Sequence, residues 1–312
     1  MKKHLLAAAI GLVLASSAQA MPFDKSSLSL SIAGTYKTDV FDEGAAEIVA
    51  HDAANQRIFV INAAAATVDV LDINDPAYPS KIGEIDVSAL GSGVNSVAVY
   101  KGLVAVAIES DPKQEPGKVA FYDSTDLSYI SDVTVGSLPD MVTFTPNGRY
   151  VLVANEGEPN DEYTVDPEGT VSIIDLRHGP LHTTIRTADF TRYIGMEDVL
   201  RDKGVRIFGP KANAAQDLEP EYITVSRNSR TAWVSLQEAN AMAMIDIRRA
   251  KVTDILPFGT KDHSQGGSEF DASDRDGAIK LTSWPTQGMY MPDAISSYQF
   301  HGKTYIDRKS VV

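Results

Sequence analysis

The chain has 312 residues, and its 42 Asp and Glu residues outnumber its 28 Lys and Arg residues, giving a formal charge of −14. This balance argues against nucleic acid or anionic lipid as a partner, because phosphate binding needs clustered basic residues. The chain has no cysteine, which excludes disulfides and thiolate chemistry, so a core drawn from its 43% hydrophobic residues must stabilise it.

The first 20 residues have the pattern of a secretory signal peptide. Lys2 and Lys3 precede an apolar run over residues 5–14, and a small-residue cleavage site follows at residues 18–20. The apolar run is shorter than the roughly 20 residues that cross a bilayer, and no later stretch is longer. We therefore expect an exported protein (periplasmic, cell-surface or secreted) without a transmembrane segment.

The rest of the chain contains an internal repeat. Three segments, Ala46–Ile73, Pro139–Leu176 and Pro220–Ile247, each read as strand, polar turn, strand, loop and a strand ending in Asp-Ile or Asp-Leu. Weaker copies begin at Asn95 and Pro292. The second residues of the five copies are Glu47, Ser96, Asp140, Glu221 and Asp293, at spacings of 49, 44, 81 and 72 residues.

These spacings predict four-stranded units of about 40–50 residues, two of them lengthened by insertions. Fourth strands are expected over 81–87, 129–135 and 252–256, and a helical pattern is confined to 196–203. We predict an all-β fold, a β-propeller of four-stranded antiparallel blades over residues 21–306, with about five blades. A β-sandwich also has many short strands and is the alternative.

The predicted propeller is incomplete at its C-terminus. Where the repeat calls for a further strand after Ile306, residues 307–312 read DRKSVV, which lacks the alternation of its neighbours. We expect these six residues to be foreign to the natural protein, a genuine short C-terminus being the alternative. The strand expected over 28–36 would then have no blade to join. We would also expect unusual exposure of four apolar side chains in the last blade: Ile295, Tyr298, Phe300 and Tyr305.

Acidic residues recur at one position of the repeat. In a propeller, the loops into first strands and the loops between second and third strands open on one face, so these carboxylates should gather there. Clustered oxygen ligands favour Ca²⁺ or Mg²⁺. The predicted metal ligands, with Ca²⁺ as the expected ion, are Asp140, Glu156, Glu158, Asp161, Glu221, Glu238 and Asp293. The alternative is that these acids only solvate the face or cap turns.

Three weaker signals also occur. Residues 271–277 resemble the start of a calcium loop, but an EF-hand would need an acid in place of Ala272 and a Glu in place of Ser283, which favours a surface turn. Asp123-Ser124 could be a phosphatase nucleophile, although it falls in a turn. Arg149, Arg230 and Lys211 could bind phosphate or solvate the surface. Common catalytic motifs are missing.

Five long motifs carry a family resemblance that extends over residues 34–306. They are ANEGEPNDEYTVDPEGTVSIIDL, DLEPEYITVSRNSRTAWVSLQEANAMAMIDI, LPFGTKDHS, FDASDRDGAI and GMYMPDAISSYQFHGKTYI. Together they resemble the choice-of-anchor I family of exported bacterial propellers, which are similar to the animal mesenchyme-specific cell surface glycoprotein. The resemblance implies a longer, seven-bladed propeller, often followed by an anchoring segment.

Many members of that family are called alkaline phosphatases or phytase-like proteins, but no catalytic residues carry over to this sequence. Two functions are therefore open. The first is binding or display in the envelope or outside the cell, with a divalent cation and an envelope or extracellular ligand as partners. The second is a calcium-dependent phosphoesterase acting on a phosphorylated small molecule.

Overall fold

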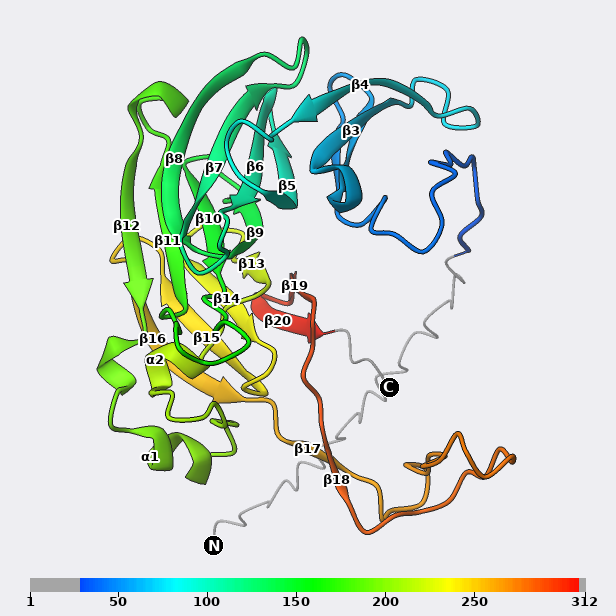
Figure 1. Cartoon of the computed structure of the whole chain (residues 1–312), viewed down its shortest axis with the longest axis vertical. Helices are drawn as coiled ribbons and strands as arrows, with labels where there is room; N and C mark the ends of the chain where they lie inside the picture. Colours follow the sequence, from blue (N-terminus) through cyan, green and yellow to red (C-terminus); the bar gives the residue numbers. More distant parts are fainter. Residues whose placement is uncertain (1–28, 309–312) are drawn as a thin grey trace, which may run out of the picture. The chain divides into compact units, whose positions relative to one another are not determined.

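The computed structural model describes residues 29–308 (Figure 1). The signal peptide expected over residues 1–20 and residues 309–312 lie outside this range. The chain divides into two units, Met1–Ala33 and Gly34–Val312, and every strand and helix below belongs to the second. Within the described range, no helix is long and apolar enough to cross a membrane.

Four antiparallel sheets follow one another along the chain, and each is a simple four-stranded meander. Sheet 1 consists of β1 (Val49–Asp52), β2 (Arg57–Asn62), β3 (Thr67–Asp72) and β4 (Ser80–Asp86). Sheet 2 consists of β5 (Gly93–Tyr100), β6 (Leu103–Glu109), β7 (Pro116–Asp123) and β8 (Tyr129–Ser137). Sheet 3 consists of β9 (Pro139–Phe144), β10 (Tyr150–Asn155), β11 (Thr170–Asp175) and β12 (Thr184–Asp189). Sheet 4 consists of β13 (Ile223–Val225), β14 (Thr231–Leu236), β15 (Ala241–Asp246) and β16 (Lys251–Pro257).

Shorter elements fill the insertions and the last part of the chain. They are the 3₁₀ turns Ala63–Ala65, Pro180–His182 and Thr191–Tyr193, helices α1 (Glu197–Asp202) and α2 (Ala214–Asp217), and strands β17 (Thr260–Asp262), β18 (Gln287–Met289), β19 (Ile295–Phe300) and β20 (Lys303–Arg308). Strands β19 and β20 form a hairpin of their own. Strands β4, β8 and β16 lie where the fourth strands were predicted, and α1 lies within the predicted helical stretch 196–203, so these predictions are confirmed.

The third strands end at equivalent places in all four sheets. The residue after each third strand donates its amide N–H to a carbonyl just before the second strand of the same sheet. The pairs are Ile73 to Gln56 (2.9 Å), Ser124 to Gly102 (2.9 Å), Leu176 to Arg149 (2.8 Å) and Ile247 to Arg230 (3.0 Å). The repeat read from the sequence is thus one repeated structural unit.

The sheets adjoin through their first strands. Strand β5 contacts β1 and β9, and β13 contacts β9 and β19. Among the described strands, no strand of one sheet pairs with a strand of another sheet through a backbone ladder. This serial arrangement is propeller-like and differs from a sandwich, in which two large sheets stack face to face.

Hydrophobic side chains fill the spaces between neighbouring sheets. Along β10, Val151 and Val153 belong to the core shared with sheet 2, whereas Leu152 and Ala154 belong to the core shared with sheet 4. A third core joins sheets 1 and 2 around Phe59. Successive strand residues point to opposite faces, so a strand between two cores must be apolar at every position, as β10 is. Each fully buried Val or Leu side chain contributes about 1.5–3 kcal/mol.

Two expectations about the ends of the repeat need correction. No strand forms over residues 29–36, and Leu30 and Ile32 are exposed there. Ile295 is buried rather than exposed, because it begins β19, which packs on β13. Tyr298, Phe300 and Tyr305 are exposed, as expected. Residues 307 and 308, assigned to the foreign tail, complete β20 opposite residues 296 and 295.

Candidate functional site

Three predicted acids lie at the beginnings of first strands. Asp140 is the second residue of β9, while Glu221 and Asp293 each stand two residues before β13 and β19. Burial raises the pKa of Asp140 to about 6, and the charge of Asp293 is the next cause. Burial also raises the pKa of Glu221 to about 8, followed by the charges of Asp140 and Asp293. The three carboxylates are therefore close enough to repel one another.

The loop between β10 and β11 adds further carboxylates to this group. Burial raises the pKa of Glu156 well above its ordinary value, and the neighbouring charges of Glu158 and Asp140 add to the effect. Glu158 forms an ion pair with Lys113, which lies in the loop between β6 and β7. The Gln114 side chain donates to the Glu158 carbonyl at 3.2 Å, so these two loops are tied together. We call the group formed by Asp140, Glu156, Glu158, Glu219, Glu221, Glu238 and Asp293 the acidic cluster.

One side of the acidic cluster opens into a cavity of about 380 Å³, which we call the acidic cavity. Its walls are the loop after β10, the segment around α2 and the turn after β14. Six acids line it: Glu158, Asp161, Asp166, Asp217, Glu219 and Glu238. Lys113 is the single basic residue in the same lining, and it is already paired with Glu158. The cavity therefore has a strongly negative interior.

Glu219 and Asp217 are the two buried acids of this lining, with 8% and 4% of their surfaces exposed, and Glu219 differs from Asp217 in its surroundings. The Glu219 carboxylate has no hydrogen-bond or ion-pair partner among the described residues, and it faces the acidic cavity. Burial raises the pKa of Glu219 to about 8, with smaller contributions from the charges of Glu238 and Asp217. An ionised carboxylate in this place is unfavourable unless a proton or a cation compensates it.

The insertion before β13 positions Glu219. Helix α2 has a capping box, in which the Asn213 side chain accepts from the Ala215 and Gln216 amides and the Gln216 side chain accepts from the Asn213 amide. The Gln216 side chain also donates to the Asp166 carbonyl at 2.8 Å, which joins α2 to the β10–β11 loop. The helix ends at Asp217, so Glu219 follows on a short, fixed stretch of backbone.

All seven predicted ligands belong to the acidic cluster or line the acidic cavity. Asp161 is an exposed residue at the cavity rim. In the described range, no three His, Cys, Asp or Glu side chains are grouped closely enough to hold a metal ion by themselves. The binding of Ca²⁺ therefore stays a prediction.

Three acids at the site were not predicted from the sequence: Glu109, Asp166 and Asp217. Glu109 contributes to the raised pKa of Asp140 and ends β6. A signal for it exists, because VAIE at 106–109 aligns with VANE at 153–156 and gives Glu109 the place of Glu156. Asp166 and Asp217 lie in insertions without repeat counterparts, so no comparable signal points to them.

Two of the weaker candidates have structural roles. Asp271 accepts from the amides of Ser273 (3.3 Å) and Lys280 (3.2 Å), which is the behaviour of a surface turn. Ser124 is fully buried, and its hydroxyl accepts from the Asn55 side chain at 3.1 Å. A buried, hydrogen-bonded serine in a turn does not have the access that a phosphatase nucleophile needs.

The model of the choice-of-anchor I domain matches residues 47–307, and the chain therefore belongs to this family. No curated protein matches the sequence. Similar solved structures include a functionally unknown protein from Desulfotomaculum acetoxidans (11% identity, TM-score 0.44), which aligns over 67% of this chain and 55% of that one. A protein from Lactobacillus plantarum has 16% identity and a TM-score of 0.45, over 78% of this chain and 57% of that one.

The β-propeller domain of Cps50 (Swd1) from Myceliophteria thermophila has 11% identity and a TM-score of 0.45, over 70% of this chain and 56% of that domain. This chain thus covers between half and two thirds of the length of these structures. Family membership is consistent with the expected export, and the compartment itself remains a prediction.

Proposed function

We propose that this protein is an exported binding protein whose acidic cluster takes up a divalent cation, calcium being the best suited. The observation that carries this proposal is the position of Glu219, a buried residue whose carboxylate has no hydrogen-bond partner among the described residues and opens on a cavity lined by five other acids. A cation would compensate the charge of Glu219 and relieve the repulsion that adds to burial in raising the pKa values of Asp140 and Glu221. Protonation has the same effect, so calcium and protons should compete for the site.

The donor chemistry fits calcium better than zinc. The candidate donors are carboxylate oxygens, which suit hard cations, and no histidine lines the acidic cavity. Glu219 would bind the ion directly at the cavity wall, with Glu238 near by and water completing the coordination shell. The bound ion would offer positive charge to an anionic group of an envelope or extracellular ligand.

Calcium titration by isothermal calorimetry tests the proposal. At pH 8.5, where Glu219 is largely ionised, we expect saturable calcium binding by the unmodified protein. The substitution Glu219→Gln keeps the size of the side chain and removes its charge, so binding should weaken at least about tenfold. Glu162→Gln is the matched control, because Glu162 is exposed and does not line the cavity. Equal binding by both variants would contradict the role of Glu219.

The phosphoesterase alternative has less support in the lining of the acidic cavity. Lys113 is the single basic residue there and is paired, so there is no free basic group to hold a phosphoryl group. Turnover of p-nitrophenyl phosphate would decide between the two functions. Activity that chelator abolishes and calcium restores would establish the enzyme, whereas calcium binding without turnover supports the binding protein.

A further inference from the structure

A second, larger cavity lies between sheets 3 and 4. Its volume is about 1220 Å³. It is lined by turns and strand ends of both sheets, and six of its lining residues are arginines: Arg149, Arg177, Arg186, Arg230, Arg248 and Arg249. We call it the arginine cleft.

The arginine cleft and the acidic cluster lie at opposite ends of the strands. Asp140 and Glu156 stand where β9 begins and β10 ends, whereas Arg149 lies in the turn where β9 ends and β10 begins. Arg230 occupies the equivalent turn between β13 and β14, and Arg248 lies in the turn between β15 and β16. Because strands of a meander alternate in direction, these turns share the end remote from the acids.

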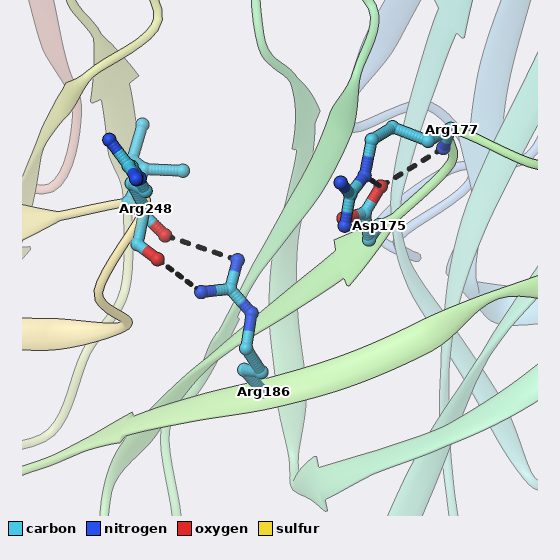
Figure 2. A network of polar contacts seen from close by, with 5 residues as sticks. Asp175, Arg177, Arg186 and Arg248 are labelled. Atoms are coloured by element: carbon cyan, nitrogen blue, oxygen red, sulfur yellow. Dashed lines mark hydrogen bonds and ion pairs between the residues drawn. The ribbon is translucent and has the colours of Figure 1, made fainter.

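Three arginines of the cleft form bonds within the protein: Arg249 lies 3.1 Å from Asp246, and Figure 2 shows the bonds of Arg177 and Arg186. Arg177 pairs with the buried carboxylate of Asp175, its Nε donating at 2.8 Å and its Nη2 lying 2.7 Å from the same oxygen. Arg186 crosses from β12 toward sheet 4, where it donates to the carbonyls of Arg248 and Ile247. These contacts hold the walls of the cleft in place without using all the guanidinium donors.

The remaining arginines of the cleft have guanidinium N–H donors that no acceptor of the described residues uses. Among residues 29–308, the side chains of Arg149, Arg230 and Arg248 have no hydrogen-bond or ion-pair partner, and all three residues are exposed. Arg149 and Arg186 both lie near the ring of Tyr150, at 5.4 and 5.7 Å from its centroid. Asn147, Asn228, Ser229 and Thr231 add neutral polar groups to the lining.

The arginine cleft is positively charged, whereas the whole chain has a net negative charge. Six arginines face one lining acid, Asp246, and Asp175 behind Arg177 is a second, which leaves an excess of four positive charges. The whole chain carries −14. Concentrating like charges around a concave surface in an acidic protein costs electrostatic free energy, which an anionic ligand would recover.

We propose that the arginine cleft binds a polyanion with several closely spaced phosphate or sulfate groups. Planar guanidinium groups donate two parallel hydrogen bonds to the oxygens of such groups, and the cleft presents several of them from two sheets at once. The cleft is much larger than one phosphate group, so the ligand carries more than one anionic group. This binding is independent of the cation proposed for the acidic cluster.

Titration calorimetry with sodium tripolyphosphate, in EDTA to remove divalent cations, tests this proposal. The triple variant Arg149→Gln, Arg230→Gln, Arg248→Gln should bind at least about tenfold more weakly than the unmodified protein. The control triple variant Lys203→Gln, Lys211→Gln, Arg275→Gln removes the same charge from exposed residues outside the cleft and should bind normally. Binding should also weaken as sodium chloride is added.

Further arms separate the remaining outcomes. In a parallel titration, a heparin-derived hexasaccharide, which carries sulfate groups, replaces tripolyphosphate. The ligand with the higher affinity shows whether the cleft prefers phosphate or sulfate groups. Arg230→Lys keeps the charge but loses the planar fork, so we expect intermediate affinity even if the triple variant is unstable. Glu219→Gln should bind both ligands normally. No saturable binding of either ligand, or equal weakening in both triple variants, would overturn the proposal.

Discussion

Asp217 and Glu219 are two residues apart and similarly buried, yet their carboxylates have opposite surroundings. Asp217 accepts hydrogen bonds from the backbone amides of Phe208 (2.5 Å) and Gly209 (2.7 Å), which satisfy it inside the fold. Glu219 has no such donors and faces the acidic cavity. The free energy of a buried carboxylate depends on this difference, because amide donors stabilise the charge of Asp217 and Glu219 has none.

The raised pKa values predict how stability changes with pH. Glu219 and Glu221 have pKa values of about 8 in the folded protein, against 4.5 ordinarily. Between these limits the folded state binds more protons than the unfolded state, so the free energy of unfolding should fall as pH rises from about 4.5 to 8. Thermal unfolding in EDTA, measured from pH 5 to pH 9, checks this. A midpoint that stays constant or rises over this interval would contradict it.

The substitution Glu219→Gln should change this profile. At pH 9 in EDTA the variant should unfold at a higher temperature than the unmodified protein, because it no longer buries an uncompensated charge. Added calcium should raise the midpoint of the unmodified protein more than that of the variant. Glu162→Gln should match the unmodified protein in both conditions. A lower midpoint for Glu219→Gln at pH 9 would mean that this carboxylate is stabilised by contacts the structure does not contain.

At the scale of elements, the four repeated sheets and the helix near 196–203 were predictable, whereas the packing of the insertions against the sheets was not. Strand order and the equivalent ends at Ile73, Leu176 and Ile247 followed from a repeated pattern of apolar runs and polar turns. The positions of Asp140, Glu221 and Asp293 followed from the same register. The burial of Glu219 depends on how α2 packs beside the β10–β11 loop, and neither segment has a counterpart elsewhere in the chain. Local periodicity contains no information about such a contact.

Asn240 shows how an insertion is attached to a sheet. It lies in the turn between β14 and β15 and is fully buried. Its side chain donates to the Gly259 carbonyl at 3.0 Å and accepts from the amides of Tyr290 (3.0 Å) and Met291 (3.3 Å). One side chain thus holds both ends of the insertion that contains β17 and β18.

Removing this side chain should loosen the insertion. Asn240→Ala removes three hydrogen bonds to the partly buried backbone groups of Gly259, Tyr290 and Met291, so we expect a loss of about 1–3 kcal/mol in the free energy of unfolding. Limited proteolysis should cleave the variant faster between residues 260 and 290. Asn74→Ala is the control, because Asn74 is exposed and bonds only within its own turn. Unchanged cleavage in Asn240→Ala would show that other contacts hold the insertion.

At the scale of the whole molecule, the hairpin β19–β20 differs from the four sheets before it. It has two strands instead of four, and its Tyr298, Phe300 and Tyr305 side chains are exposed. Tyr298 and Tyr305 stack on each other at 5.4 Å between ring centroids, which leaves their other faces open. Exposed aromatic groups beside an unpaired strand edge favour association between molecules.

The 312-residue chain should therefore self-associate through this hairpin. The double substitution Tyr298→Lys, Phe300→Lys adds two charges on the exposed aromatic surface and should shift the protein toward monomer in analytical ultracentrifugation. Tyr78→Lys is the control, because Tyr78 is an exposed aromatic residue far along the chain from the hairpin. A sharply unfolding monomer in the unmodified protein would contradict this prediction.

The position of a bound cation tests the central claim most directly. Crystals of the protein soaked in manganese chloride at pH 8.5 would reveal the ion by its anomalous scattering, manganese standing in for calcium. We predict a peak in the acidic cavity beside Glu219 and Glu238, and its loss in Glu219→Gln. A peak only at residues 271–277, or no peak at all, would contradict a cation-binding role for the acidic cluster.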